Sequence, residues 1–380
     1  MGTKTRDRGI AVLRILMGWV FLYAGAEKLL GIGLEAGKTW SAGGFLKFAT
    51  AGSWPGAADG AIINPTHDFW VSLAGNAQLL GIINVLVPVG VVEEVDAYLN
   101  AALPQSYAGW PTRFATTWRP DARSQVQVDS TSGLAVDRLG VDPSDGLDPL
   151  SWLGLTGQSI LEVTGGPVFH DSAGQLEVLR EALRWYPDDV WRYVLAADWA
   201  RLGEELPLAG RAGHRGDEAG SRVVMARLVR TAMHLGFLLE RAWPPYAKWL
   251  GTAYARLAVA GPTTGPLSAA LKGPDWRARE DGLTQALDAL LVNQRAVGLP
   301  TPKAATEPFW DRPFRAVAAQ IPQLLIADVT DPRVQDLPPG VGAVEQWADS
   351  VAVLGAPHRR LAAAAAALAA ADGQLRSTEA

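Results

Sequence analysis

The hydrophobic pattern changes character near residue 92 of this 380-residue chain. Before that point lie two long apolar segments, Ile10 to Leu34 and Phe69 to Val92, and the second carries no charged side chain. Each is long enough to cross a bilayer as a helix, which takes about 20 residues. The pattern therefore predicts a hairpin of two transmembrane helices. A buried core hairpin of a soluble protein would give the same pattern and is the alternative interpretation.

After Val92 the apolar positions mostly follow the period of amphipathic helices, about 3.6 residues. This period predicts helices at 91–102, 148–155, 175–186, 187–206, 217–243, 279–297, 312–327, 341–354 and 359–371. Short alternating or apolar runs predict strands at 113–118, 125–130 and 159–164. Asp148 and Pro149 mark the start of one helix, since an aspartate N-cap followed by proline favours helix initiation.

These patterns predict a mainly α protein in three parts. A two-helix membrane hairpin is followed by a small α+β region and then by a large helical domain. The expected boundaries are 1–92, 93–171 and 172–372, with a tail at 373–380. No feature of the pattern indicates an oligomeric state.

The charges at the N-terminus predict the orientation of the hairpin. Lys4, Arg6 and Arg8 outnumber Asp7, and an excess of positive charge favours the cytoplasmic side of a membrane. Two crossings return the chain to that side. We therefore expect the protein in the cell membrane, in contact with lipid, with its N-terminus and its C-terminal domain in the cytoplasm.

Composition excludes several classes of function. The net charge of −5 gives no positive field of the kind that nucleic-acid-binding proteins use. The chain has no cysteine, which excludes disulfides, thiolate catalysis and cysteine-ligated zinc. Its five histidines show neither the HxxxH nor the HxH spacing. The sequence therefore predicts no metal site of the zinc type.

The N-terminal part of the sequence resembles the DoxX family of small membrane proteins. The resemblance rests on "LRILMGWVFLYAGAEKLLG" and on the stretch from Lys38 to Gly90. DoxX proteins are four-helix membrane bundles, some of them linked to quinone or thiosulfate oxidation, and only two such helices would be present here. Glu27 and Lys28 are candidate functional residues, because ionisable side chains within a membrane segment usually serve function. The resemblance implies a membrane subunit as one alternative function.

From about residue 92 the chain resembles the family called domain of unknown function 4037. The resemblance rests on stretches such as "GWPTRFATTW", "ILEVTGGPVFHD", "LRWYPDDVWRYVLAADWARL" and "VEQWADSVAVL". It implies a nucleotidyltransferase-like fold followed by a helical region. The expected catalytic core, with its Gly-Ser turn and Asp-x-Asp pair, would precede "GWPTRF", where the DoxX-like text stands instead. A gene fusion would produce this arrangement, and a non-functional fusion or assembly artefact is a further alternative.

The missing motif indicates that the chain is not an active nucleotidyltransferase. Such enzymes hold Mg²⁺ with two or three carboxylates at the phosphates, and this sequence contains no Asp-x-Asp. We therefore predict no catalytic residue and no required cofactor, although Mg²⁺ and a nucleotide stay open as ligands. Asp129, at the end of a predicted strand, is a candidate for a residual carboxylate, and a simple turn former is the alternative.

A short positive stripe is the strongest candidate for ligand binding. Arg227, Arg230 and His234 share one helix face, with Arg222 at its edge. One interpretation is a solvated face with local ion pairs. The other is a cradle for a nucleotide or another anion, to which Arg211, His214 and Lys248 would also contribute. The expected function is thus, at most, nucleotide or anion binding by a degenerate nucleotidyltransferase-like protein.

Overall fold

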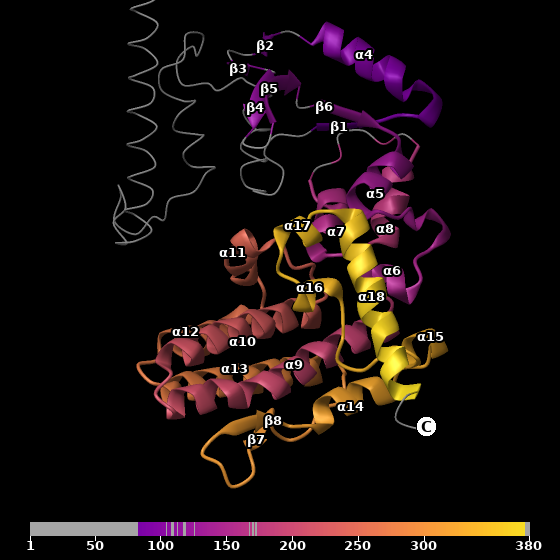
Figure 1. The fold of residues 1–380 in the computed structure, drawn as a ribbon. Coiled ribbons are helices and arrows are strands. Elements are labelled where there is room, and N and C mark those ends of the chain that lie inside the picture. The colour runs from indigo at the N-terminus through magenta and orange to yellow at the C-terminus, as the bar shows by residue number, and fades with distance from the viewer. Residues whose placement is uncertain are drawn as a thin grey trace, which may run out of the picture. The chain divides into compact units, whose positions relative to one another are not determined.

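The computed structural model describes residues 83–376 except positions 104, 108–109, 112, 117–118, 125, 167, 169–170 and 172. These residues belong to one compact unit, Ile83–Ala380, and they are mainly helical, as predicted. Figure 1 shows long helices together with shorter helices and small strand pairs.

The helices are α4 (Val92–Ala102), α5 (Thr131–Leu139), α6 (Pro149–Gly154), α7 (Gly157–Thr164), α8 (Gln175–Ala182), α9 (Asp188–His214), α10 (Glu218–Leu239), α11 (Leu250–Tyr254), α12 (Ala260–Lys272), α13 (Trp276–Ala296), α14 (Gln320–Ala327), α15 (Pro332–Gln335), α16 (Val344–Trp347), α17 (Val351–Leu354) and α18 (Pro357–Arg376). The strands are β1 (Ile83–Leu86), β2 (Ser106–Tyr107), β3 (Trp110–Pro111), β4 (Arg113–Thr116), β5 (Arg119–Ser124), β6 (Val126–Asp129), β7 (Thr306–Pro308) and β8 (Arg315–Val317).

The strands pair two by two. β1 and β6 run parallel, in a register that places Ile83 opposite Val126 and Leu86 opposite Asp129. The pairs β2–β3, β4–β5 and β7–β8 are antiparallel. Because parallel strands need a crossover connection, β1 and β6 enclose the whole segment from α4 to β5 between them.

The predicted transmembrane helix from Phe69 to Val92 is wrong over its last ten residues. Ile83–Leu86 form a strand, Val89–Val91 a single 3-10 turn, and α4 begins at Val92. An apolar run fits a parallel strand as well as a membrane helix, because neighbouring strands satisfy its backbone hydrogen bonds. Within the described ranges, no helix is long and apolar enough to cross a membrane. The segment Ile10 to Leu34, with Glu27 and Lys28, lies outside the described residues.

Most of the other predicted elements are confirmed, with shifted ends. The predicted helices at 91–102, 148–155, 175–186, 187–206, 217–243, 279–297 and 359–371 correspond to α4, α6, α8, α9, α10, α13 and α18. The predicted strands at 113–118 and 125–130 correspond to β4 and β6. At the start of α6, Asp148 Oδ1 accepts the backbone N–H of Ser151 at 2.7 Å, as an N-cap should.

Three predictions from the pattern are wrong. The strand predicted at 159–164 is helix α7, because Thr156 and Ser159 form a capping box that starts a helix. The helix predicted at 312–327 is strand β8 followed by α14. The helix predicted at 341–354 consists of two four-residue helices, α16 and α17.

A bundle of four helices, α9, α10, α12 and α13, forms the main core. The side chain of Trp199 in α9 is fully buried, and its indole N–H donates to Gln294 Oε1 of α13 at 2.7 Å. Gly282 brings α13 close to α12, since a Cβ at this position would lie 2.6 Å from the backbone nitrogen of Ala270. The bundle is therefore closely packed, and the polar N–H group of its buried indole has a hydrogen-bond partner.

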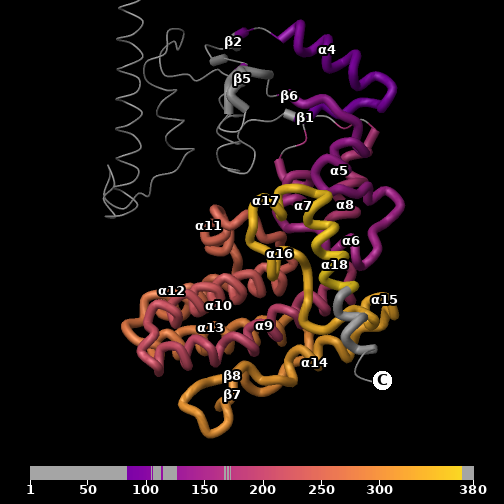
Figure 2. Tube along the Cα trace, in the orientation of Figure 1, coloured from indigo at the N-terminus to yellow at the C-terminus, as the bar shows by residue number. Residues whose placement is uncertain are grey.

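A second layer, α5 to α8, packs beside the bundle together with the C-terminal helix α18. Figure 2 shows α18, in yellow, running beside α5 and α6 although more than 200 residues separate them in sequence. An aromatic cluster holds this layer near α9, with Trp152, Trp185, Tyr186 and Trp243 in mutual ring contact. Four aromatic rings at one junction bury a large apolar area.

The β7–β8 hairpin packs on α9 and α13 through a buried acid. Glu280 is 5% exposed, and its Oε1 accepts the backbone N–H of Arg315 at 3.2 Å. Burial raises the pKa of Glu280 from 4.5 to about 7, although this hydrogen bond opposes the rise. Stability must therefore fall as the pH rises from about 4.5 to about 7, because the unfolded chain releases this proton first.

We expect Glu280→Gln to stabilise the protein at pH 8 and to leave it nearly unchanged at pH 4.5. A glutamine retains the oxygen that accepts from Arg315 and carries no charge. The expected gain in the free energy of unfolding at pH 8 is up to about 3 kcal/mol. Urea denaturation of both proteins at the two pH values measures it. An equal gain at both pH values would show that the buried charge is not its cause.

Candidate anion-binding pocket

A buried cluster of charged side chains joins α9, α10 and α16. His234 Nδ1 of α10 lies 2.6 Å from Asp198 Oδ2 of α9, and its Nε2 lies 3.8 Å from Glu345 Oε1 of α16. Asp198 Oδ1 also accepts the side-chain amide of Gln346 at 2.7 Å. The side chains of His234 and Glu345 are each 11% exposed and that of Asp198 is 2% exposed. The cluster therefore operates in a medium of low polarity, where such contacts are strong.

The imidazole of His234 is held in its charged form. Burial alone would lower the pKa of His234, but the negative charges of Asp198 and Glu345 outweigh burial and raise it to about 10. At neutral pH the ring carries a proton on each nitrogen, with one carboxylate at each side. Two carboxylates are thus held near a single cation.

Glu345 connects this cluster to the start of α7. Its Oε1 and Oε2 accept the backbone N–H of Gly157 at 3.0 and 3.1 Å, at the positive end of the helix. Arg230 of α10 donates from Nη2 to the backbone oxygen of Glu345 at 3.1 Å. A helix of only four residues is in this way fixed to α7, α9 and α10.

Beside Glu345 lies a cavity of about 380 Å³, here called the arginine pocket. It is bounded by residues of α5, α7, α10, α16, α17 and α18 and by the segment after α10 (Figure 1). Its lining residues include three arginines, Arg138, Arg230 and Arg360. This volume is at the lower end of the range that small-molecule sites occupy.

Arg360 is the most unusual of the three. It is only 2% exposed, and it donates to two backbone oxygens, that of Leu354 at 3.1 Å and that of Arg138. Among the described residues, its Nε has no hydrogen-bond partner. In the part of the chain that the structure describes, it forms no ion pair. Burial lowers the pKa of Arg360, as expected for a cation with no carboxylate in contact.

The other two arginines differ in the number and kind of acceptors that they contact. Arg138 forms an ion pair with Asp137 at 3.3 Å and donates to Gln127 Oε1 at 2.8 Å. Arg230 has the backbone oxygen of Glu345 as its acceptor and, among the described residues, no ion-pair partner. The pocket therefore presents two guanidinium groups, of Arg230 and Arg360, whose charge no carboxylate contact neutralises.

The structure brings only one of the seven candidate arginines, histidines and lysines from the sequence into this pocket, namely Arg230. Arg227, one helical turn before it, forms an ion pair with Glu205 at 2.8 Å, and Arg222 forms one with Glu218 at 2.9 Å. Both match the solvated-face interpretation. His234 belongs to the same stripe but is buried in the cluster described above.

The remaining candidates lie in other surroundings. The ring of His214, at the end of α9, is 6.2 Å from that of Trp276 and 5.7 Å from that of Phe314. Arg211 is exposed one turn earlier in the same helix. Lys248 places its Nζ 5.0 Å from the ring of Trp249. None of the three lines the arginine pocket.

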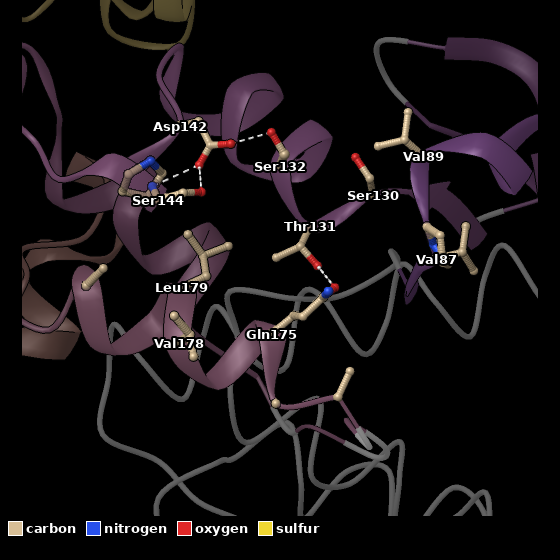
Figure 3. A pocket seen from close by; sticks show the side chains of 15 residues that line it. Val87, Val89, Ser130, Thr131, Ser132, Asp142, Ser144, Gln175, Val178 and Leu179 are labelled. Carbon is tan, nitrogen blue, oxygen red and sulfur yellow. Dashed lines mark hydrogen bonds between the residues drawn. The ribbon is translucent and has the colours of Figure 1, made fainter.

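A second cavity, of about 470 Å³, lies where β1 and β6 end and α5 begins (Figure 3). Hydroxyl groups and a carboxylate dominate its polar lining, with Asp142 accepting from Ser132 and Ser144, and none of the described lining residues is basic. Asp129 does not line this cavity. Its Oδ1 accepts the backbone N–H of Ser130 at 2.7 Å, at the start of α5.

The donor sets limit what the two cavities can hold. In the described residues, no group of three histidines or carboxylates is placed to bind a metal ion. Of these two cavities, the arginine pocket is the one in which described residues offer guanidinium groups to an anion. Arg360 and Arg138 were missed in the sequence because arginines at the start of an alanine-rich helix and in a short helix look like ordinary surface residues. Only the packing of α18 against α5 reveals that Arg360 is buried.

We expect His234→Gln to lower the free energy of unfolding by about 3 kcal/mol at pH 6.5, because it leaves two buried carboxylates without their cation. The folded pKa is raised, so the contribution of His234 is complete below about 6.5 and is lost as the pH rises through about 10. Urea denaturation of both proteins from pH 6.5 to 10 should show the difference shrinking. A difference independent of pH would contradict a charged His234.

Comparison with known proteins supports part of this picture. Residues 152–250 match the family model described as a domain of unknown function, DUF4037. The match runs from α6 to the start of α11 and includes Arg230, His234 and Asp198. Glu345 and Arg360 lie beyond it. No curated protein and no solved structure matches the chain. The chain thus contains a region similar to this family, spanning two sides of the arginine pocket and most of the buried cluster.

Proposed function

We propose that this protein binds a small anionic ligand, such as a nucleotide phosphate, in the arginine pocket. The observation that carries the proposal is Arg360, a guanidinium that is 2% exposed, lines a cavity and forms no ion pair with any described residue. An unpaired buried cation is costly to a folded protein. Costs of this kind are concentrated at binding and catalytic sites.

Arg230 of α10, which lines the same pocket as Arg360 of α18, supports the same proposal. Its backbone acceptor, the oxygen of Glu345, fixes one end of the guanidinium and leaves further N–H groups for a ligand. Two guanidinium groups on different elements can hold a phosphate or carboxylate from two directions. The acceptor of Arg230 belongs to α16, which the buried His234 cluster holds in place. Arg360 is held by the backbone oxygens of Leu354 and Arg138.

We further propose that the protein binds without catalysing nucleotidyl transfer. That chemistry needs two or more carboxylates around Mg²⁺. The parallel pair β1–β6, with Asp129 at its end, is compatible with a remnant of a nucleotidyltransferase-like sheet. However, the carboxylate of Asp129 accepts the backbone N–H of Ser130, the N-cap of α5, and Asp142 is the one acid among the described residues that line the neighbouring cavity.

A membrane subunit linked to quinone or thiosulfate oxidation was the other functional candidate from the sequence. Its residues Glu27 and Lys28, and the first of its two predicted membrane segments, lie outside the described part of the chain. No contact between described residues favours this candidate. The predicted membrane location and the contact with lipid likewise remain predictions.

We expect Arg230→Gln to weaken the binding of AMP and of inorganic phosphate by about tenfold or more, because a charge-assisted hydrogen bond contributes about 1.5–3 kcal/mol. Arg227→Gln is the matched control: it removes the same charge from the same helix, one turn away, where Glu205 already pairs with it. Isothermal titration of the full chain measures both affinities. Binding of either ligand by the control should equal that of the unchanged protein.

Two results would contradict the proposal. One is the absence of any AMP or phosphate binding by the unchanged protein at millimolar concentration. The other is equal weakening by Arg227→Gln and Arg230→Gln, which would indicate a diffuse electrostatic effect rather than a site. The unfolding transition of each variant, measured beside that of the unchanged protein, shows that a loss of binding is not a loss of folding.

A further inference from the structure

The arginine pocket contains unpaired charges of both signs. Besides the guanidinium groups of Arg230 and Arg360, carboxylates line it, among them Glu162 of α7 and Asp349 between α16 and α17. Within the described ranges neither Glu162 nor Asp349 forms an ion pair, although guanidinium groups line the same cavity. Because these opposite charges share a cavity without contacting one another, a ligand can fit between them and contact both.

Glu162 is the carboxylate best placed to meet a ligand. It is half-buried, and its Oε1 accepts the side-chain amide of Gln158 at 3.0 Å. That amide is neutral, and among the described residues no cation contacts the carboxylate of Glu162. The carboxylates of Glu162 and Glu345 both act electrostatically on Arg360, which places Glu162 within reach of the same bound molecule.

The other acids are less suited to this role. Glu345 already accepts the backbone N–H of Gly157 and faces the charged ring of His234. Asp137 pairs with Arg138. Asp349 is exposed, so solvent screens its charge. Glu162 is thus the carboxylate in the lining that is both shielded from solvent and lacking a cationic partner.

We propose that the ligand of the arginine pocket is a small zwitterion, whose anionic group binds Arg230 and Arg360 and whose amine binds Glu162. This inference rests on the proposed anion site and specifies the class of its ligand. A ligand with only negative charge would bind the guanidinium groups more weakly, because Glu162 opposes it, and one with only positive charge would be repelled by the guanidinium groups. A phosphorylated amine or an amino acid satisfies both, within a cavity of about 380 Å³.

Two probes of equal size separate the roles of the charges. O-Phosphoethanolamine and propyl phosphate have the same number of heavy atoms and differ in an ammonium group that replaces a methyl group. We expect the full chain to bind O-phosphoethanolamine about tenfold more tightly than propyl phosphate, measured by isothermal titration. In Glu162→Gln this preference should fall to about onefold, while the binding of propyl phosphate is retained or strengthened.

Glu204→Gln is the matched control, because Glu204 is an exposed glutamate of α9 that does not line the pocket. It should keep the tenfold preference. Equal affinity of the unchanged protein for the two probes would overturn the zwitterion inference and leave anion binding intact. A preference that survives in Glu162→Gln would also overturn it, since the amine would then bind elsewhere. If neither probe, AMP nor phosphate binds, the proposed function itself fails.

Discussion

The contact of His234 with Asp198 and Glu345 is the constraint on which the site depends. It joins a four-residue helix, α16, to two long helices, next to the buried side chains of Val344 and Gln346 in the same short helix. A positive charge buried between two carboxylates is stable only when all three groups stay in place, because removal of one leaves the others uncompensated. The cluster therefore holds Glu345, whose backbone oxygen accepts a hydrogen bond from the guanidinium group of Arg230.

Two buried arginines in this structure differ in the groups that they contact. Arg279 of α13 is fully buried, and it is neutralised by Glu218, which it contacts at 2.6 and 2.9 Å. Arg360 is buried to a similar extent and has only backbone oxygens as acceptors. The first arrangement stabilises the packing of α10 against α13. The second leaves a net charge beside a cavity, which distinguishes a site from a structural ion pair.

The sequence predicts α9, α10 and α13 well because their apolar positions follow the amphipathic period, but it does not predict α12 of the same bundle. The prediction is wrong where an apolar run is compatible with more than one structure. At Ile83–Leu86 a parallel strand is found in place of the predicted membrane helix. The site was predicted only through Arg230 and His234, which share a helix face. Glu162 and Arg360 come from helices far apart in sequence, and their meeting depends on tertiary packing that no local pattern encodes.

The central claim is that Arg230 and Arg360 hold an anion in the arginine pocket. A crystal structure of the full chain soaked in tungstate, a tetrahedral analogue of phosphate with strong anomalous scattering, tests it most directly. The account predicts an anomalous peak within hydrogen-bond distance of both guanidinium groups, and its loss in Arg230→Gln crystals. A pocket without a peak, in crystals where tungstate binds other arginines on the surface, would contradict the claim.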